Sequence, residues 1–300
     1  MLIRSKIPWR SMLQQLWPVT LAVACYSIAV SWLDARFHLE QLQLPIALVT
    51  LPGAFVGVLL AFRTNSSYAR WWEARTLWGR IVNDSRTWTR QVVAFVGRAD
   101  TSNRDDVTQL AHRQIAWCRL LTRSLRHQDS RVALDDVLSA EDSEFLSQHD
   151  HPANAILVLQ ALQLSRLRSR ETIDTWQQLA MEDTLARLTD AMGGCERIRN
   201  TPFPPHYGLW IHYLIYLSIL LLPLSLVQVP AVGLILLTVP IAMGYLIIEQ
   251  VAIFLESPFQ QAASGTPMSS LTRTIEINIR QLLGEAETPN RLAPVDGVLL

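Results

Sequence analysis

Charged side chains are missing from three long windows of the chain. Residues 11–33 and 41–62 contain no Asp, Glu, Lys or Arg, and each is long enough for one membrane-spanning helix, which needs about 20 mostly apolar residues. Residues 200–248 also lack these side chains. That window is too long for one span and suits two, with a turn at Gln228-Val229-Pro230. The pattern predicts four transmembrane helices.

The second window runs without a helix-breaking residue into a polar segment rich in Arg and Trp, so residues 51–79 are expected to belong to one long helix passing from lipid into water. Its apolar half carries two neighbouring stripes at a four-residue spacing. The first is Ala54, Val58 and Phe62, and the second is Gly53, Gly57 and Ala61. Small residues at this spacing allow close helix packing in a membrane. One stripe could pack while the other faces a neighbour or a lumen; the alternative, that both only pack, remains open.

The rest of the chain predicts a helical region in water. Apolar residues recur with helical spacing at 115–125 and 156–167, and helix is expected over 171–199 and near 269–283. Residues 140–154 are expected to form a loop, and the C-terminal end is expected to be disordered. The predicted organisation is 1–62 for the N-terminus and two membrane helices, 63–199 for a cytoplasmic helical region, 200–255 for two further membrane helices and 256–300 for a cytoplasmic tail.

Positive charge decides the orientation. Arg4, Lys6 and Arg10 precede the first span, six arginines lie between positions 63 and 90 after the second, and only Arg36 lies in the connection between them. Both termini and the 63–199 region are therefore expected to be cytoplasmic. The chain has 300 residues, a mean hydropathy of +0.18, and 26 basic against 26 acidic side chains. This balance gives no net field that would attract nucleic acid.

Candidate chemistry is sparse. His149-Asp150-His151 lacks a third ligand at a suitable spacing, so a loop is favoured over a metal site. Cys195, beside Glu196, has no partnering His nearby in sequence and is expected to be a buried structural thiol. Gly193-Gly194 is expected to be a helix irregularity. Glu73 with Arg70, and Glu196 with Arg199, are expected to form ion pairs on a helix face or at an interface. His206 and His212 are expected to hydrogen bond near a membrane interface.

A membrane enzyme would need converging ionisable groups within the spans, which have almost none. No catalytic residue, cofactor or metal is predicted. A membrane scaffold or sensor needs only the helical region and remains an alternative to a channel.

Several segments resemble the signature of bacterial bestrophin-type channels. They are AFRTNSSYARWWEARTLWG at 61–79, GCERI at 194–198 followed by Thr201-Pro202 and Pro204, Glu256 with Pro258-Phe259, and RTIEIN at 273–278. They occur in family order, whereas residues 91–187 match only in helical character.

The resemblance implies an all-α membrane protein that assembles as a homopentameric ring around one axial pore for small inorganic ions, in a bacterial inner membrane and in contact with membrane lipid. It places a hydrophobic neck at Ala54, Val58 and Phe62, and a second, cytoplasmic constriction at Leu179. Ala54 is smaller than expected, so the outermost ring is expected to be wide. The family default is chloride, and the alternative is a monovalent cation such as sodium. The acidic calcium-binding cluster of eukaryotic members is replaced here by QQAAS at 260–264, so it is not carried over.

Overall fold

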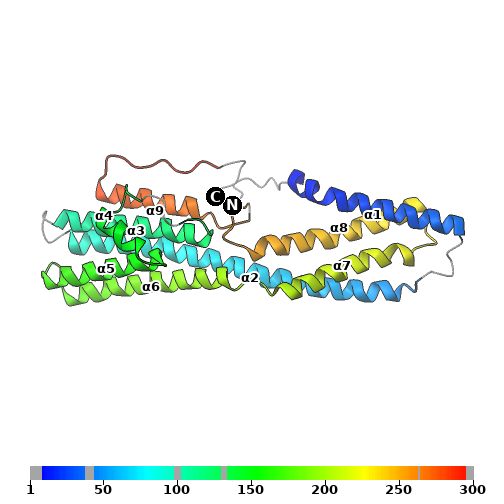
Figure 1. Ribbon diagram of the computed structural model, residues 1–300, viewed down its shortest axis with the longest axis horizontal. Coiled ribbons are helices and arrows are strands. Elements are labelled where there is room, and N and C mark those ends of the chain that lie inside the picture. Colours follow the sequence, from blue (N-terminus) through cyan, green and yellow to red (C-terminus); the bar gives the residue numbers. More distant parts are fainter. Residues whose placement is uncertain (1–8, 38–43, 98–102, 130–133, 263, 295–300) are drawn as a thin grey trace. The chain divides into compact units, whose positions relative to one another are not determined.

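The computed structural model describes residues 9–37, 44–97, 103–129, 134–262 and 264–294, with only the backbone described for 9–15. Within these ranges every regular element is a helix (Figure 1). The helices are α1 (Trp9–Phe37), α2 (Ala47–Gln91) with a π-helical turn at Val92–Val96, α3 (Arg104–Leu125), α4 (Ala140–Ser147), α5 (Pro152–Ser169), α6 (Thr175–Asn200), α7 (Pro205–Ser225), α8 (Ala231–Glu256) and α9 (Met268–Leu283).

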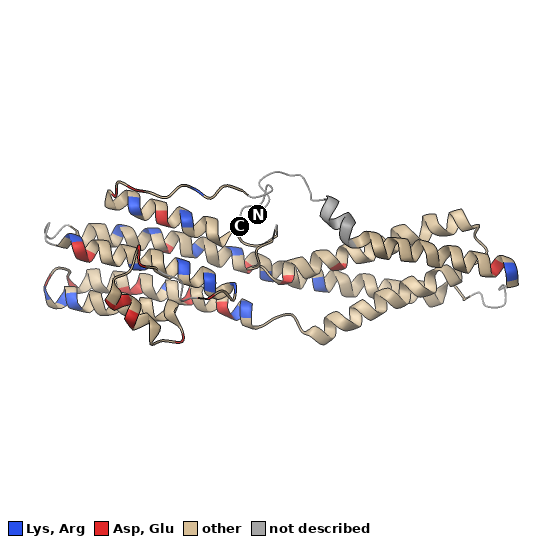
Figure 2. Ribbon diagram, turned by 45° about the horizontal axis from the view of Figure 1, so that its top comes forward, with Lys and Arg blue, Asp and Glu red and all other residues tan. Residues whose placement is uncertain are grey.

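The chain divides into two compact units. The membrane unit comprises residues 4–71 and 202–257, and the helical unit comprises residues 1–3, 72–201 and 258–300. Charged side chains are concentrated on the helices of the helical unit and are sparse along those of the membrane unit (Figure 2). Helix α2 contributes its first part to the membrane unit and its second part to the helical unit.

Four described helices are long and apolar enough to cross a membrane, as the charge-free windows predict. They are the helices at Leu16–Phe37, Ala47–Val96, Pro205–Ser225 and Ala231–Glu256. Helices α1 and α8 pack along each other, and polar groups join them: Ser27 Oγ lies 2.9 Å from Thr238 Oγ1, and Thr20 Oγ1 donates to Met243 Sδ at 2.8 Å. Such hydrogen bonds satisfy hydroxyl groups that lipid cannot solvate.

The helical unit is built around α3, whose residues are buried by α5, α6, α9 and the π-helical turn after α2. Three tryptophans, Trp78, Trp88 and Trp117, are fully buried in its core. A polar network also lies inside. Arg113 donates to both carboxylate oxygens of Asp142 at 2.9 and 2.6 Å and to Gln163 Oε1 at 2.6 Å. This bidentate pairing compensates the removal of both charges from water.

The prediction of a loop at 140–154 is wrong for most of these residues, because they belong to two helices that are started by capping side chains. Ser139 caps α4 by accepting a hydrogen bond from the Asp142 backbone N–H at 3.1 Å, and Arg113 holds the Asp142 side chain. Pro152 occupies the first turn of α5, where proline is tolerated, and His151 caps that helix by accepting from the Asn154 N–H at 3.1 Å. Only the residues between these helices form a loop.

Helix α6 also differs from expectation at two places. It begins at Thr175 rather than near Glu171, because Asp174 and Gln177 form a reciprocal capping box, while Glu171 adopts a left-handed conformation with φ of 57°. The expected irregularity at Gly193-Gly194 is absent, since α6 runs continuously through both glycines. Gly194 instead permits close packing, because a Cβ there would lie 3.0 Å from both terminal methyl groups of Leu77.

Candidate functional site

The membrane part of α2 has two faces of different character. Val56, Leu60, Arg63 and Ser67 are buried and follow the three- and four-residue spacing of a helix face. Val56 and Leu60 belong to a core formed with residues of α1, α7 and α8. This face fixes how α2 is rotated within the membrane unit, and therefore which side chains the helix leaves outside.

The stripe of Ala54, Val58 and Phe62 lies on the outside. All three residues are exposed within the single chain, with Val58 at 54% and Phe62 at 63% exposure. Packing inside one chain therefore does not account for this stripe. The stripe therefore faces a lumen, a second copy of the chain or lipid.

Phe55 is a further exposed side chain on this face, with 65% exposure. It precedes Phe62 by seven residues, which places the two about 20° apart around the helix. Four-residue spacing overlooked Phe55, whereas a search for positions seven apart would have found it.

Arg63, directly after Phe62, anchors α2 to α8. Its Nε donates to Glu256 Oε1 at 2.7 Å, and its Nη1 lies 3.7 Å from Glu249 Oε1. The Arg63 and Glu249 side chains are only 7% and 4% exposed. His212 of α7 joins the same cluster, with Nδ1 3.0 Å from Glu249 Oε1. The guanidinium carbon also lies 5.6 Å from the centre of the Phe203 ring, a cation–π distance. The cluster links three helices beside Phe62.

The second stripe, of small residues, borders an apolar groove between α2 and α8. Gly53 packs under Tyr245, whose hydroxyl would lie 2.9 Å from a Cβ at that position. Gly57 and Ala61 line the groove, which has a volume of about 610 Å³, together with Tyr245, Val251 and Leu255. The stripe thus packs at one end and leaves space at the other.

Leu179, the expected second constriction, lies on α6 and is 56% exposed. The same side of α6 presents Trp176, Asp183, Ala186 and Asp190, all of them exposed. Asp183 pairs with Arg187 one turn later. Leu179 belongs to the helical unit, whereas the three residues of the expected neck belong to the membrane unit.

The other sequence candidates have structural roles. His149 Nδ1 lies 2.7 Å from the Phe145 carbonyl oxygen, and His151 Nε2 lies 2.6 Å from Glu196 Oε1. Glu196 therefore pairs with His151, and Arg199 contacts His127 instead of Glu196. Glu73 pairs with Arg197, which is 124 positions away in the chain and could not be predicted from local spacing.

Cys195 is buried as expected, and burial raises its pKa to about 12. Among the described residues, no three His, Cys, Asp or Glu side chains are grouped so that they could hold a metal ion.

Comparison with known proteins identifies the family. The family model for the bacterial and fungal bestrophin proteins matches residues 5–281 of the 300-residue chain. The chain belongs to this bestrophin family. Among the proteins similar to the chain, a voltage-dependent anion channel-forming protein of Ralstonia nicotianae is 33% identical over 94% of this chain and 92% of its own length. A voltage-dependent anion channel-forming protein of Escherichia coli K12, YneE, is 29% identical over 90% of this chain and 87% of its own length.

Solved bestrophin structures share the fold. A crystal structure of a bacterial bestrophin homologue from Klebsiella pneumoniae superimposes with a TM-score of 0.82 and 29% identity, covering 89% of this chain and 98% of that one. A second crystal structure, of a singly substituted variant described as a membrane protein, gives a TM-score of 0.84 and 28% identity, covering 91% of this chain and 100% of that one. The four-span, all-helical membrane architecture is therefore that of the bestrophin family.

Proposed function

We propose that the chain is one subunit of a homopentameric anion channel of the bacterial inner membrane. Helix α2 lines the axial pore, with Ala54, Val58 and Phe62 as its hydrophobic neck and Leu179 as a second, cytoplasmic constriction. The observation that carries this proposal is the division of α2 into a face locked by its core and by Arg63 and an opposite face with an exposed apolar stripe.

Five copies of this stripe would form three stacked apolar rings. An apolar constriction offers permeating ions no hydrogen bonds and conducts only when it is wet. Phe62 is the largest of the three side chains and would form the tightest ring, followed by Val58 and then Ala54. Gating by wetting and drying would therefore depend most on Phe62.

The groove beside Gly57 and Ala61 supports an assembly of several copies. It is lined mainly by apolar side chains of α2 and α8, and small residues allow a helix from another copy to approach closely. The number of copies, five, comes from the family resemblance.

Anion selectivity is supported by the Ralstonia and Escherichia coli relatives, which are described as voltage-dependent anion channel-forming proteins. The neck side chains carry no formal charge and do not choose the sign of the ion. One observation favours cations instead: the exposed side of α6 that carries Leu179 also carries Asp183 and Asp190. Rings of carboxylates attract cations, so a monovalent-cation channel is the second candidate.

Reversal potentials in asymmetric NaCl distinguish the two candidates. The protein reconstituted in planar bilayers should show a reversal potential displaced towards the chloride equilibrium potential. Displacement towards that of sodium, abolished by Asp190→Asn together with Asp183→Asn, would establish the cation channel. Absence of conductance at every voltage would leave a non-conducting membrane scaffold or sensor.

We place both termini, residues 63–199 and the tail from 256 in the cytoplasm, because Arg and Lys flank the spans on that side. No catalytic step is assigned to the chain. Calcium is not expected to gate it, because a calcium site takes six to eight oxygen ligands and residues 260–264 contain no carboxylate.

A further inference from the structure

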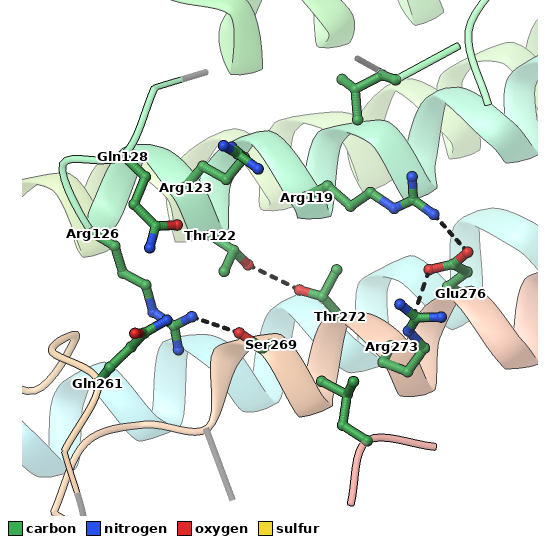
Figure 3. Close-up of a pocket in the computed structure, with 12 residues that line it drawn as sticks. Arg119, Thr122, Arg123, Arg126, Gln128, Gln261, Ser269, Thr272, Arg273 and Glu276 are labelled. Carbon is green, nitrogen blue, oxygen red and sulfur yellow. Dashed lines mark hydrogen bonds and ion pairs between the residues drawn. The ribbon is translucent and has the colours of Figure 1, made fainter. Parts of the chain in front are cut away.

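A polar cleft in the helical unit lies between α3 and α9 (Figure 3). Its volume is about 410 Å³. Among the described residues that line it are four arginines, Arg119, Arg123, Arg126 and Arg273, and a single carboxylate, that of Glu276. A hydrogen bond between Thr122 and Thr272, whose hydroxyl oxygens are 2.9 Å apart, joins the two helices within the cleft. The side chains that line the cleft therefore carry an excess of positive charge.

At one end of the cleft the charges are balanced. Glu276 accepts a hydrogen bond from Arg119 Nη2 at 2.6 Å, and its second oxygen lies 3.8 Å from Arg273 Nε. Arg119 also binds both carboxylate oxygens of Asp136, at 2.8 and 2.9 Å. This end is a completed ion-pair network and needs no further anion.

At the other end, two arginines lack a carboxylate partner in the described part of the chain. Arg123 Nε donates to the backbone carbonyl of Asp129 at 2.7 Å. Arg126 Nη1 donates to Ser269 Oγ at 2.5 Å, while its Nε and Nη2 are buried without a hydrogen-bond partner among the described residues. Burial lowers the pKa of Arg126. Arg126 is a partly buried cation, and leaving two of its buried donor atoms unsatisfied is unfavourable unless an anion completes them.

We propose that this cleft binds a phosphoryl-bearing anion, with Arg126 and Arg123 as its principal ligands and Ser269 beside them. Guanidinium groups present planar pairs of N–H donors that match the oxygens of a phosphate. The cleft is larger than a single halide ion requires and falls within the usual size of small-molecule sites, about 300–1,000 Å³.

The lining also restricts what else the ligand carries. Leu134 and Leu292 supply its apolar surface, and no aromatic side chain is among the described lining residues. A stacked base or a buried acyl chain is therefore poorly accommodated. The phosphoryl group could come from a soluble phosphate compound or from a lipid headgroup, and binding to either would join α3 to α9.

Calorimetric titration of the detergent-purified full-length protein with inorganic pyrophosphate, at constant ionic strength, tests the proposal. The wild-type protein should bind pyrophosphate. Arg126→Gln should weaken binding by about tenfold or more, because it removes charge-assisted hydrogen bonds. The matched control is Arg166→Gln, on the exposed side of α5, which should bind like the wild type. Arg123→Gln, with a partly exposed side chain, gives a second variant should Arg126→Gln fail to fold.

A second arm separates the two sources of the phosphoryl group. Vesicles of phosphatidylglycerol, with phosphatidylcholine vesicles as the reference, are presented to the reconstituted protein in competition with pyrophosphate. Displacement of pyrophosphate by the anionic vesicles alone identifies a lipid headgroup, and no displacement identifies a soluble phosphate compound. The proposal is overturned if the wild type does not bind pyrophosphate, or if the Arg126, Arg123 and Arg166 variants all bind it equally.

Discussion

Arg63 links the proposed neck to the rest of the membrane unit. It follows Phe62 in sequence, lies about 100° further around α2 on the buried face of the helix, and contacts Glu256 and Glu249 of α8. Gly208 leaves room for it, because a Cβ there would lie 3.3 Å from Arg63 Nη2. A buried ion pair of this kind adds little to the net stability of the fold. Removing one partner is nevertheless costly, because it leaves the other charge buried and uncompensated. Arg63 therefore fixes the rotation of α2, which in turn sets the direction of Phe62.

Arg63→Gln should destabilise the protein by on the order of 3 kcal/mol, because it leaves the buried Glu249 carboxylate with a weaker set of partners. Thermal unfolding in detergent measures this loss. The double variant Arg63→Gln with Glu249→Gln should recover part of the stability, since the uncompensated charge is gone. Arg36→Gln, at the exposed end of α1, serves as the control. Equal stability of all these variants would show that the ion cluster does not hold α2.

The Cys195 and Cys118 thiols should be inert in the folded protein. Burial raises the pKa of both to about 12, so the reactive thiolate is scarce at pH 8, and access is blocked as well. A disulfide reagent followed by mass spectrometry of peptides should find both unlabelled at pH 8 and labelled after denaturation. Rapid labelling of native Cys195 would mean that α6 opens readily or that this thiol has a functional role.

Helices of the membrane unit could be predicted from sequence because the bilayer demands long charge-free windows. The continuity of α2 was predictable for a different reason, because no helix-breaking residue separates its apolar half from its charged half. Helix α4 was missed because it has only eight residues and is held by Ser139 and by Arg113, contacts that local periodicity does not show. The pairing of Glu73 with Arg197 was likewise beyond local rules. The neck at Ala54, Val58 and Phe62 came from the resemblance and stays a prediction.

Two adjacent glycines in α6 separate helix propensity from packing. Gly194 lies against Leu77, whereas a Cβ on Gly193 would meet nothing within 4 Å. Gly193→Val and Gly194→Val change the helix propensity by the same residue exchange, so their difference reports the contact. Gly194→Val should be less stable by about 1–3 kcal/mol, the range typical of overpacking. Indistinguishable unfolding temperatures for the two variants would show that α2 and α6 do not pack as described.

One chain alone does not explain all of its apolar surface. The outer stripe of α2 and the groove beside Gly57 are both left uncovered by the chain's own helices. Lipid can cover part of such a surface, but only a ring of copies turns one stripe into a pore. The sequence predicts the helices of each copy from physical rules, whereas the five-fold arrangement rests on the resemblance to the family. The proposed channel is therefore tested by substituting Phe62, because the effect on conductance and on assembly differs between a side chain in a lumen and one in a packing contact.

Single-channel recording of Phe62→Ala in planar bilayers, beside the wild type and Phe37→Ala, is that test. Phe37 is similarly exposed, at 65%, but ends α1. A lumen-facing Phe62 predicts higher conductance for Phe62→Ala, unchanged conductance for Phe37→Ala, and intact pentamers by native mass spectrometry in both. If Phe62 instead packs between helices, its loss leaves a cavity costing about 3–5 kcal/mol. Unchanged conductance with weakened assembly in Phe62→Ala would then contradict the proposed neck.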